Sequence, residues 1–230
     1  MSQGTDDVSA LLFTVGVAVL STLVILPFGV LAAWGLARWR GPTALARPFV
    51  ETLLTLPLVL PPTAVGLVLL ELLKPRGVLG RALALVSFEV VFTWKAVVVA
   101  AAVMSFPLLV RSARTAFEEV DPSLVAVART LGCSGPQTFR RVTLPLAWRG
   151  ILAGALLAFA RALGEFGATV LVAGYAPQGR QTLALAIFQR TETRRDGDAI
   201  RLVALAAALA FVAVWSTELV VRRRRQRLRV

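Results

Sequence analysis

Long apolar segments alternate with short polar ones along this chain. Five apolar segments lie at about residues 8–37, 49–73, 88–110, 150–173 and 200–221. A helix needs about 20 mostly apolar residues to cross a hydrocarbon core of roughly 30 Å, and each of these segments is long enough. The pattern predicts an all-α polytopic membrane protein, with about five transmembrane helices in a single domain over residues 1–230.

The second apolar segment is interrupted by prolines at positions 57, 61 and 62. Proline removes a backbone donor and clashes with the preceding turn, so we expect a broken or strongly bent helix. Such a break in a membrane is tolerated where it is buried in protein or lines a cavity. Pro61 and Pro62 are therefore candidates for lining a pathway, and a merely irregular structural helix is the alternative.

The longest polar stretch runs over residues 111–149, between the third and fourth apolar segments. Asp121, Pro122 and Ser123 form a helix-entry signal, and Gly132 is a stop signal. Between them, one face of a short helix carries Leu124, Val127, Ala128 and Leu131. Two turns of helix are not stable alone, so this face must pack on the chain's own membrane domain, in a partner's groove, or on both.

Composition supports a membrane protein and charge predicts its orientation. The chain has 230 residues, 57% of them hydrophobic, and a net charge of +12. With the C-terminus in the cytoplasm, residues 38–48, 111–149 and 222–230 are internal and hold fifteen arginines, whereas the external segments hold seven Lys or Arg. The positive-inside rule thus predicts an external N-terminus and a cytoplasmic C-terminus, and it explains the charge without nucleic acid.

The residue inventory argues against chemistry on this chain. It has no histidine and a single cysteine, Cys133, which excludes histidine catalysis, Cys/His metal sites and an intrachain disulfide. It also has no phosphate-binding Gly-x-x-x-x-Gly-Lys loop. We therefore expect no catalytic residue, no metal and no cofactor.

The fourth apolar segment contains two charged residues, Arg161 and Glu165, four positions apart and on one helical face. Counted from Gly150, Arg161 lies about 16 Å along the helix, near the bilayer centre. A charge there costs at least about 2.5 kcal/mol, so the pair must face protein or water. It either holds the bundle together or lines a translocation path at a homodimer axis. The close approach of two helices there would use Gly164 and Gly167, on either side of Phe166.

The polar stretch resembles the cytoplasmic signature of ABC importer permeases. Ala128 and Gly132 are followed after nine residues by Val142, any residue, and Leu144-Pro145. In that family this segment is the coupling helix, which sits in a groove of a cytoplasmic ATPase. The resemblance implies that the docking residues are Leu124, Ala128, Arg129, Thr130, Leu131, Gly132, Val142, Leu144 and Pro145.

One position departs from the family pattern. The signature usually begins with a glutamate, but positions 125 and 126 are Val and Ala. The groove contact of that glutamate must be absent here, or be supplied by Glu118 or Glu119.

Nearly the whole chain is similar to the molybdate permease subfamily. The resemblance is carried by LTLPLVLPP at 54–62, FTWK at 92–95 and ARALGEFGA at 160–168. It implies a homodimeric, multi-pass permease of the cytoplasmic (inner) membrane that imports molybdate. Its partners would be membrane lipid, two ATPase subunits that bind the ATP, and an extracytoplasmic oxyanion-binding protein.

The residues alone are also compatible with other functions. Sulfate and tungstate permeases share the Gly-Glu-Phe-Gly stretch, so either anion is an alternative cargo. A membrane-embedded enzyme would need a nucleophile with a base or a metal cluster at membrane depth. A simple membrane anchor would not need three prolines in one span or a buried charge pair.

Overall fold

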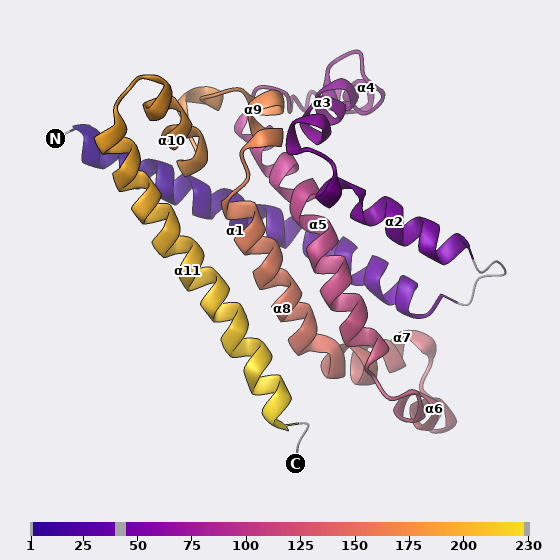
Figure 1. Cartoon of the computed structure of the whole chain (residues 1–230). Coiled ribbons are helices and arrows are strands. Elements are labelled where there is room, and N and C mark those ends of the chain that lie inside the picture. The colour runs from indigo at the N-terminus through magenta and orange to yellow at the C-terminus, as the bar shows by residue number, and fades with distance from the viewer. Residues whose placement is uncertain (1, 40–44, 228–230) are drawn as a thin grey trace.

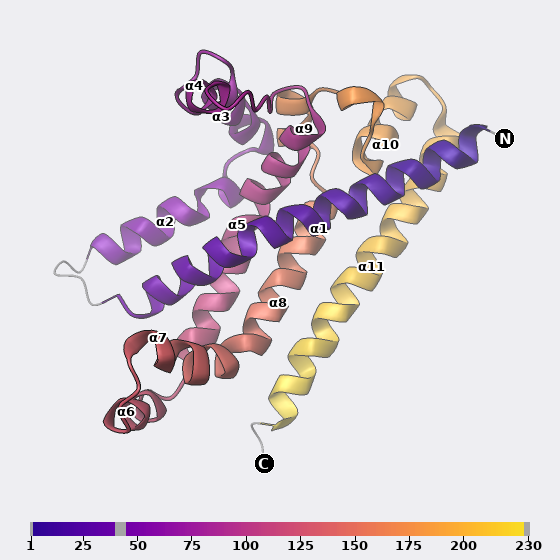
Figure 2. The same ribbon diagram turned by 180° about the vertical axis from the view of Figure 1, so that it is seen from behind.

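The computed structural model describes residues 2–39 and 45–227, and every regular element in these two ranges is a helix. Figures 1 and 2 show the arrangement from opposite sides. The elements are α1 Ser2–Ala37, α2 Ala46–Val59, α3 Pro62–Leu73, α4 Val78–Ala84, α5 Trp94–Glu118, α6 Pro122–Thr130, α7 Gly135–Thr138, a π-helical turn Phe139–Thr143, α8 Leu144–Leu163, α9 Gly167–Ala173, a 3₁₀ turn Pro177–Gly179, α10 Leu183–Glu192 and α11 Asp196–Arg227.

Four helical segments in the described ranges are long and apolar enough to cross a membrane. They are α1, α5, α11, and the continuous segment of α7, the π turn and α8. The bent pair α2 and α3 makes a fifth if it counts as one span. These helices connect two ends of the molecule (Figure 1). Helices α6 and α7 and the C-terminus lie at one end, and the N-terminus, α4, α9 and α10 lie at the other. The predicted all-α polytopic fold is confirmed.

Helix α5 is the centre of the bundle and packs against both α1 and α8. In the most apolar 18-residue stretch of α5, 67% of the residues are buried, whereas the corresponding share in α11 is 17%. Helix α11 lies at the edge of the bundle, against α8 and α10. Small residues line the centre of α5, among them Ala96, Ala100 and Ala113, each 0% exposed. They allow the neighbouring helices to approach closely, as is typical of helix packing in membranes.

The third helix is displaced from its expected position at 88–110. It begins at Trp94, where the Thr93 side chain caps it by accepting a hydrogen bond from the Lys95 N–H. At its other end it continues eight residues beyond Val110, although five of these eight residues are polar. Hydropathy predicts that the helix ends before Arg111, where the polar stretch begins. Instead it continues to Glu118, and Arg114 in this part forms ion pairs with Glu118 and with Glu51 of α2. The polar connection is therefore shorter than 111–149.

The second segment is broken, as its prolines predict. Helices α2 and α3 meet at 107°. Leu60 and Pro61 have extended backbone conformations, and Pro62 occupies the first position of α3, where its missing N–H costs nothing. Pro57 lies inside α2 without ending it.

The fourth segment, expected as one helix over 150–173, is also broken. Helix α8 begins earlier, at Leu144, and ends at Leu163, and α9 begins at Gly167. Arg161 thus lies near the C-terminal end of α8, about 26 Å from Leu144 along the axis, rather than in the middle of a continuous helix. The break has a cause that hydropathy does not show, because Glu165 supplies the acceptor for a new helix.

The two breaks pack against each other through glycines. A Cβ atom on Gly66 of α3 would lie 2.8 Å from the Ala168 Cα, and one on Gly167 of α9 would lie 2.7 Å from the Pro62 Cβ. Two half-helices therefore start side by side, with their backbones in close contact. The close approach expected at Gly167 between two subunits occurs within one chain, because Pro62 already occupies that space.

Candidate functional site

Helix α6 is well defined at both ends. The Asp121 carboxylate accepts a hydrogen bond from the Ser123 N–H at 2.8 Å, and this backbone donor lowers the pKa of Asp121. At the other end, the Gly132 N–H donates to the Arg129 carbonyl and the Cys133 N–H to the Ala128 carbonyl, both at 3.0 Å. This pair of bonds is a Schellman motif, which needs the left-handed conformation that Gly132 adopts at φ +86°.

The two faces of α6 have different surroundings. Ala128 is buried, whereas Leu124, Val127 and Leu131 are 46%, 55% and 79% exposed. These three side chains are therefore only partly covered by the chain itself. On the opposite face, Val125, Ala126 and Arg129 line a crevice in the same chain. Arg129, expected among the docking residues, lines this crevice and is also exposed.

An aromatic cluster supports the segment that follows α6. Phe139 lies 4.9 Å from Trp34 of α1 and 6.1 Å from Phe117 of α5, measured between ring centroids. Phe139 also opens the π turn, whose last bond runs from the Leu144 N–H to the Phe139 carbonyl. The wider turn accommodates Pro145, which has no N–H and would crowd the preceding carbonyl of a regular helix. Through this turn the chain stays helical from Gly135 to Leu163.

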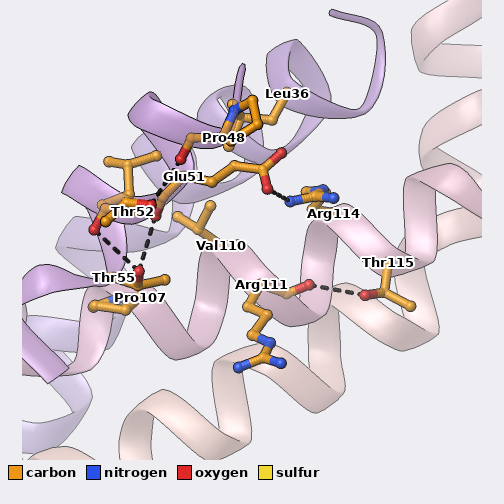
Figure 3. A pocket seen from close by; sticks show the side chains of 11 residues that line it. Leu36, Pro48, Glu51, Thr52, Thr55, Pro107, Val110, Arg111, Arg114 and Thr115 are labelled. Carbon is orange, nitrogen blue, oxygen red and sulfur yellow. Dashed lines mark hydrogen bonds and ion pairs between the residues drawn. The ribbon is translucent and has the colours of Figure 1, made fainter. Parts of the chain in front are cut away.

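Four charged residues form a closed ring of ion pairs between α2 and the end of α5. That they meet was not predicted from the sequence. Arg47 contacts Glu51 at 2.8 Å and also Glu118, while Arg114 lies 2.7 Å from Glu51 and 2.9 Å from Glu118. Figure 3 shows the ion pair between Glu51 and Arg114, both of which line a cavity, with the Arg111 side chain directed away from them. A sequence signal did exist, because both Arg47–Glu51 and Arg114–Glu118 are opposite charges four residues apart.

The ring of ion pairs bears on whether Glu118 can replace the glutamate that is absent from the signature. Glu118 already accepts from two arginines, so offering its carboxylate to a partner would disrupt the link between α2 and α5. Glu118 is therefore a poor substitute for the glutamate that the family places at the start of its signature.

Arg161 and Glu165 form the expected ion pair, but across a helix end. The Arg161 Nη1 lies 2.9 Å from the Glu165 Oε2, and the Glu165 Oε1 accepts from the Ala168 N–H at 2.9 Å. Glu165 is 3% exposed, and its Oε2 has no donor with hydrogen-bond geometry among the described residues, although the ion pair is close. The carboxylate thus connects the end of α8 to the start of α9.

The structure brings together only part of the predicted path. Pro62, Glu165 and Gly167 gather where the two breaks meet. Gly164 is exposed, and no described atom lies within 4 Å of where its Cβ would be. Phe166 packs against Phe188 of α10, with ring centroids 5.1 Å apart. Within the described ranges, no group of three His, Cys, Asp or Glu residues is placed to hold a metal ion.

Comparison with known proteins identifies the family. Residues 25–226 match the family described as binding-protein-dependent transport system inner membrane component. The chain belongs to this family. It is a permease subunit, a part of an ABC transporter that does not itself hydrolyse ATP.

Two sequence relatives and one solved structure extend this result. The permease is 40% identical over 220 residues to the molybdenum transport system permease protein ModB of Escherichia coli K12, covering 95% of each chain. It is 38% identical over 184 residues to the sulfate transport system permease protein CysT of Salmonella typhimurium, covering 79% of this chain and 65% of that one. It also shares the fold of a bacterial ABC transporter involved in the import of alginate, with a TM-score of 0.70 at 19% identity, over 94% of this chain and 79% of that one.

Replacing Gly132 tests whether its backbone conformation holds the end of α6. A Cβ at this position would meet nothing within 4 Å, so only the positive φ opposes a side chain. We expect Gly132→Val to cost about 2 kcal/mol locally, and Gly132→Asn to cost only a few tenths because asparagine tolerates this conformation. Hydrogen exchange of residues 124–133 should accelerate about 30-fold in the valine variant. Equal protection in the two variants would contradict this role.

Proposed function

We propose that this permease moves molybdate across the inner membrane as part of an ATP-driven importer. The observation that supports this cargo is the 40% identity to a molybdenum transport permease, which extends over 95% of both chains. The likeness to a sulfate permease is nearly as high in identity but covers less of either chain. Sulfate is therefore the second candidate.

The exposed apolar face of α6 is the surface that we assign to the ATPase. Leu124, Val127 and Leu131 are exposed on α6, and α6 lies at one end of the bundle (Figure 1). Exposed apolar side chains on a short, rigidly capped helix fit the groove of a soluble subunit. The aromatic cluster and the charge ring at the base of α6 would carry a displacement of this helix to α1, α2 and α5.

The assembly that follows has two copies of the permease and two ATPases, with a binding protein at the far end. This orientation places α6 and the C-terminus in the cytoplasm and the N-terminus outside, in agreement with the distribution of arginines. ATP is bound by the ATPase. No cofactor is required on the permease.

We assign the translocation path to the junction of the two breaks. In this proposal Arg161 offers a transient positive site for an oxyanion, and the paired Glu165 prevents tight trapping, since a pathway must release what it admits. Pro61 and Pro62 begin the neighbouring half-helix. The positive ends of the two half-helices meet at this junction and favour an anion.

Substitution of the α6 face tests docking and orientation together. Leu124→Glu combined with Val127→Glu places two charges in the proposed contact, and we expect at least a tenfold loss of co-purifying ATPase, about 1.4 kcal/mol. Arg140→Glu, at an exposed position outside α6, is the control and should retain the ATPase. Because the ATPase is cytoplasmic, this result also places α6 on the cytoplasmic side. Undiminished ATPase recovery with the double variant would refute both assignments.

Competition for uptake tests the cargo. Cells that carry the permease with its ATPase and binding protein should accumulate labelled molybdate, and a hundredfold excess of unlabelled molybdate should abolish that accumulation. The same excess of sulfate should leave most of it. Equal competition by sulfate would assign the permease to sulfate instead.

Glu165→Gln tests the junction. The amide oxygen can still accept from the Ala168 N–H, but the charge that balances Arg161 is lost, so we expect molybdate uptake to fall about tenfold or more. ATPase co-purification should be unchanged, because α6 is distant in sequence and lies at the other end of the bundle. Glu192→Gln, an exposed neutralisation on α10, is the control. Wild-type uptake by the Glu165 variant would exclude a role in the path.

A further inference from the structure

A second surface feature lies beneath α6, separate from the docking face and from the helix junction. It is a crevice of about 700 Å³ between α6, the end of α1 and the end of α5. Its walls include Arg38 and Trp39 at the end of α1, Arg47 at the start of α2, and Arg129 on α6. Three arginines thus line one cavity at the end of the bundle where the C-terminus lies.

The positive charge of this crevice is only partly neutralised. Glu118 is the one acidic residue among the described residues that line it, and it is bound to Arg47 and to Arg114 of the charge ring. Arg38 lies over the Trp34 ring at 5.4 Å, which orients its guanidinium but leaves the charge unbalanced. Neither Arg38 nor Arg129 forms an ion pair with a carboxylate in the described part of the chain. Two guanidinium groups are therefore available to an anion.

The remaining walls of the crevice show what kind of anion fits. Phe117, Val120, Val125 and Ala126 give it an apolar side, and Trp39 is 38% exposed at its edge. Tryptophan at the end of a membrane helix is typical of the headgroup level. The crevice opens where α1 and α5 end and the polar connections begin. The crevice thus combines a fixed positive charge with an apolar wall beside the end of a membrane helix.

We propose that this crevice binds the phosphate of an anionic phospholipid from the cytoplasmic leaflet, with Arg38 and Arg129 as its two principal ligands. Guanidinium groups bind phosphate oxygens in a bidentate way, and basic pockets between membrane helices on the cytoplasmic side are typical sites for anionic headgroups. The proposal rests on the orientation given under the proposed function. A bound headgroup would tie α6 to α1, and so would stabilise the position of the coupling helix.

The same chemistry would accept a free tetrahedral oxyanion, and the experiment separates the two sources. The full 230-residue permease is purified in a neutral detergent, stripped of lipid, and titrated with dioleoyl phosphatidylglycerol while bound lipid is counted by native mass spectrometry. Parallel titrations use dioleoyl phosphatidylcholine, inorganic phosphate and molybdate. Binding is measured without ATPase or transport, so a failure of the proposed cargo or docking does not affect this readout.

Two pairs of substitutions make the test specific. Arg38→Gln with Arg129→Gln removes the two unpaired charges from the crevice. Arg140→Gln with Arg141→Gln removes the same charge from exposed positions nearby that do not line it. Each arginine near a membrane surface contributes about 1 kcal/mol to attraction of anionic lipid, so the crevice pair should weaken phosphatidylglycerol binding about 30-fold. Elution on gel filtration and thermal unfolding show whether each variant is folded.

Each outcome of the titrations either supports or overturns the proposal. One phosphatidylglycerol per chain in the wild type and in the control pair, lost in the crevice pair and not displaced by phosphate or molybdate, supports the proposal. Equal binding of phosphatidylglycerol and phosphatidylcholine would overturn it, as would retention of the lipid by the folded crevice pair. Binding of phosphate or molybdate in place of the lipid would assign the crevice to a free oxyanion and also overturn it. If the crevice pair does not fold, the single variants Arg38→Gln and Arg129→Gln are used, each with an expected loss of about fivefold.

Discussion

A helix that breaks inside an apolar segment must satisfy its backbone groups within the protein, and this constraint shapes the permease. Two breaks, between α2 and α3 and between α8 and α9, pack directly against each other. Gly66 and Gly167 let the two new helix starts touch, and the Glu165 carboxylate accepts the Ala168 N–H at the second start. An unsatisfied polar group in hydrocarbon costs several kcal/mol, so the acceptor that Glu165 supplies at the start of α9 stabilises the second break.

The opposite end of the molecule is organised by charge and aromatic packing. The ring formed by Arg47, Glu51, Arg114 and Glu118 joins α2 to α5, and Phe139 joins the segment after α6 to α1 and α5. Each ion pair is partly exposed and contributes little alone, but the closed ring fixes four side chains in mutually dependent positions. Helix α6 thus has a rigid base and an exposed apolar face. That combination suits an element that transmits force from a soluble partner to the membrane helices.

Several features could be predicted from residues alone, and others could not. The break at Pro61 was predictable because proline removes a donor whatever the tertiary context. The break after Leu163 was not, because hydropathy treats residues 150–173 as one apolar segment and does not show that the Glu165 carboxylate accepts the Ala168 N–H at a new helix start. Likewise, most of the helical residues 111–118 are polar and resemble a loop by hydropathy, yet Arg114 and Glu118 stabilise helix there by pairing with each other and with α2.

The sequence by itself determined the class of protein, the family, the broken second segment and the capped short helix. These follow from local properties: apolar length, the absent proline N–H, the Asp121 and Gly132 caps, and motif spacing. Only the tertiary structure decided that the fourth segment is two helices, that Gly167 packs within its own chain, and that three arginines share a crevice under α6. The last two depend on contacts between residues far apart in the chain, where a glycine or an arginine acquires its role from the partner that it meets.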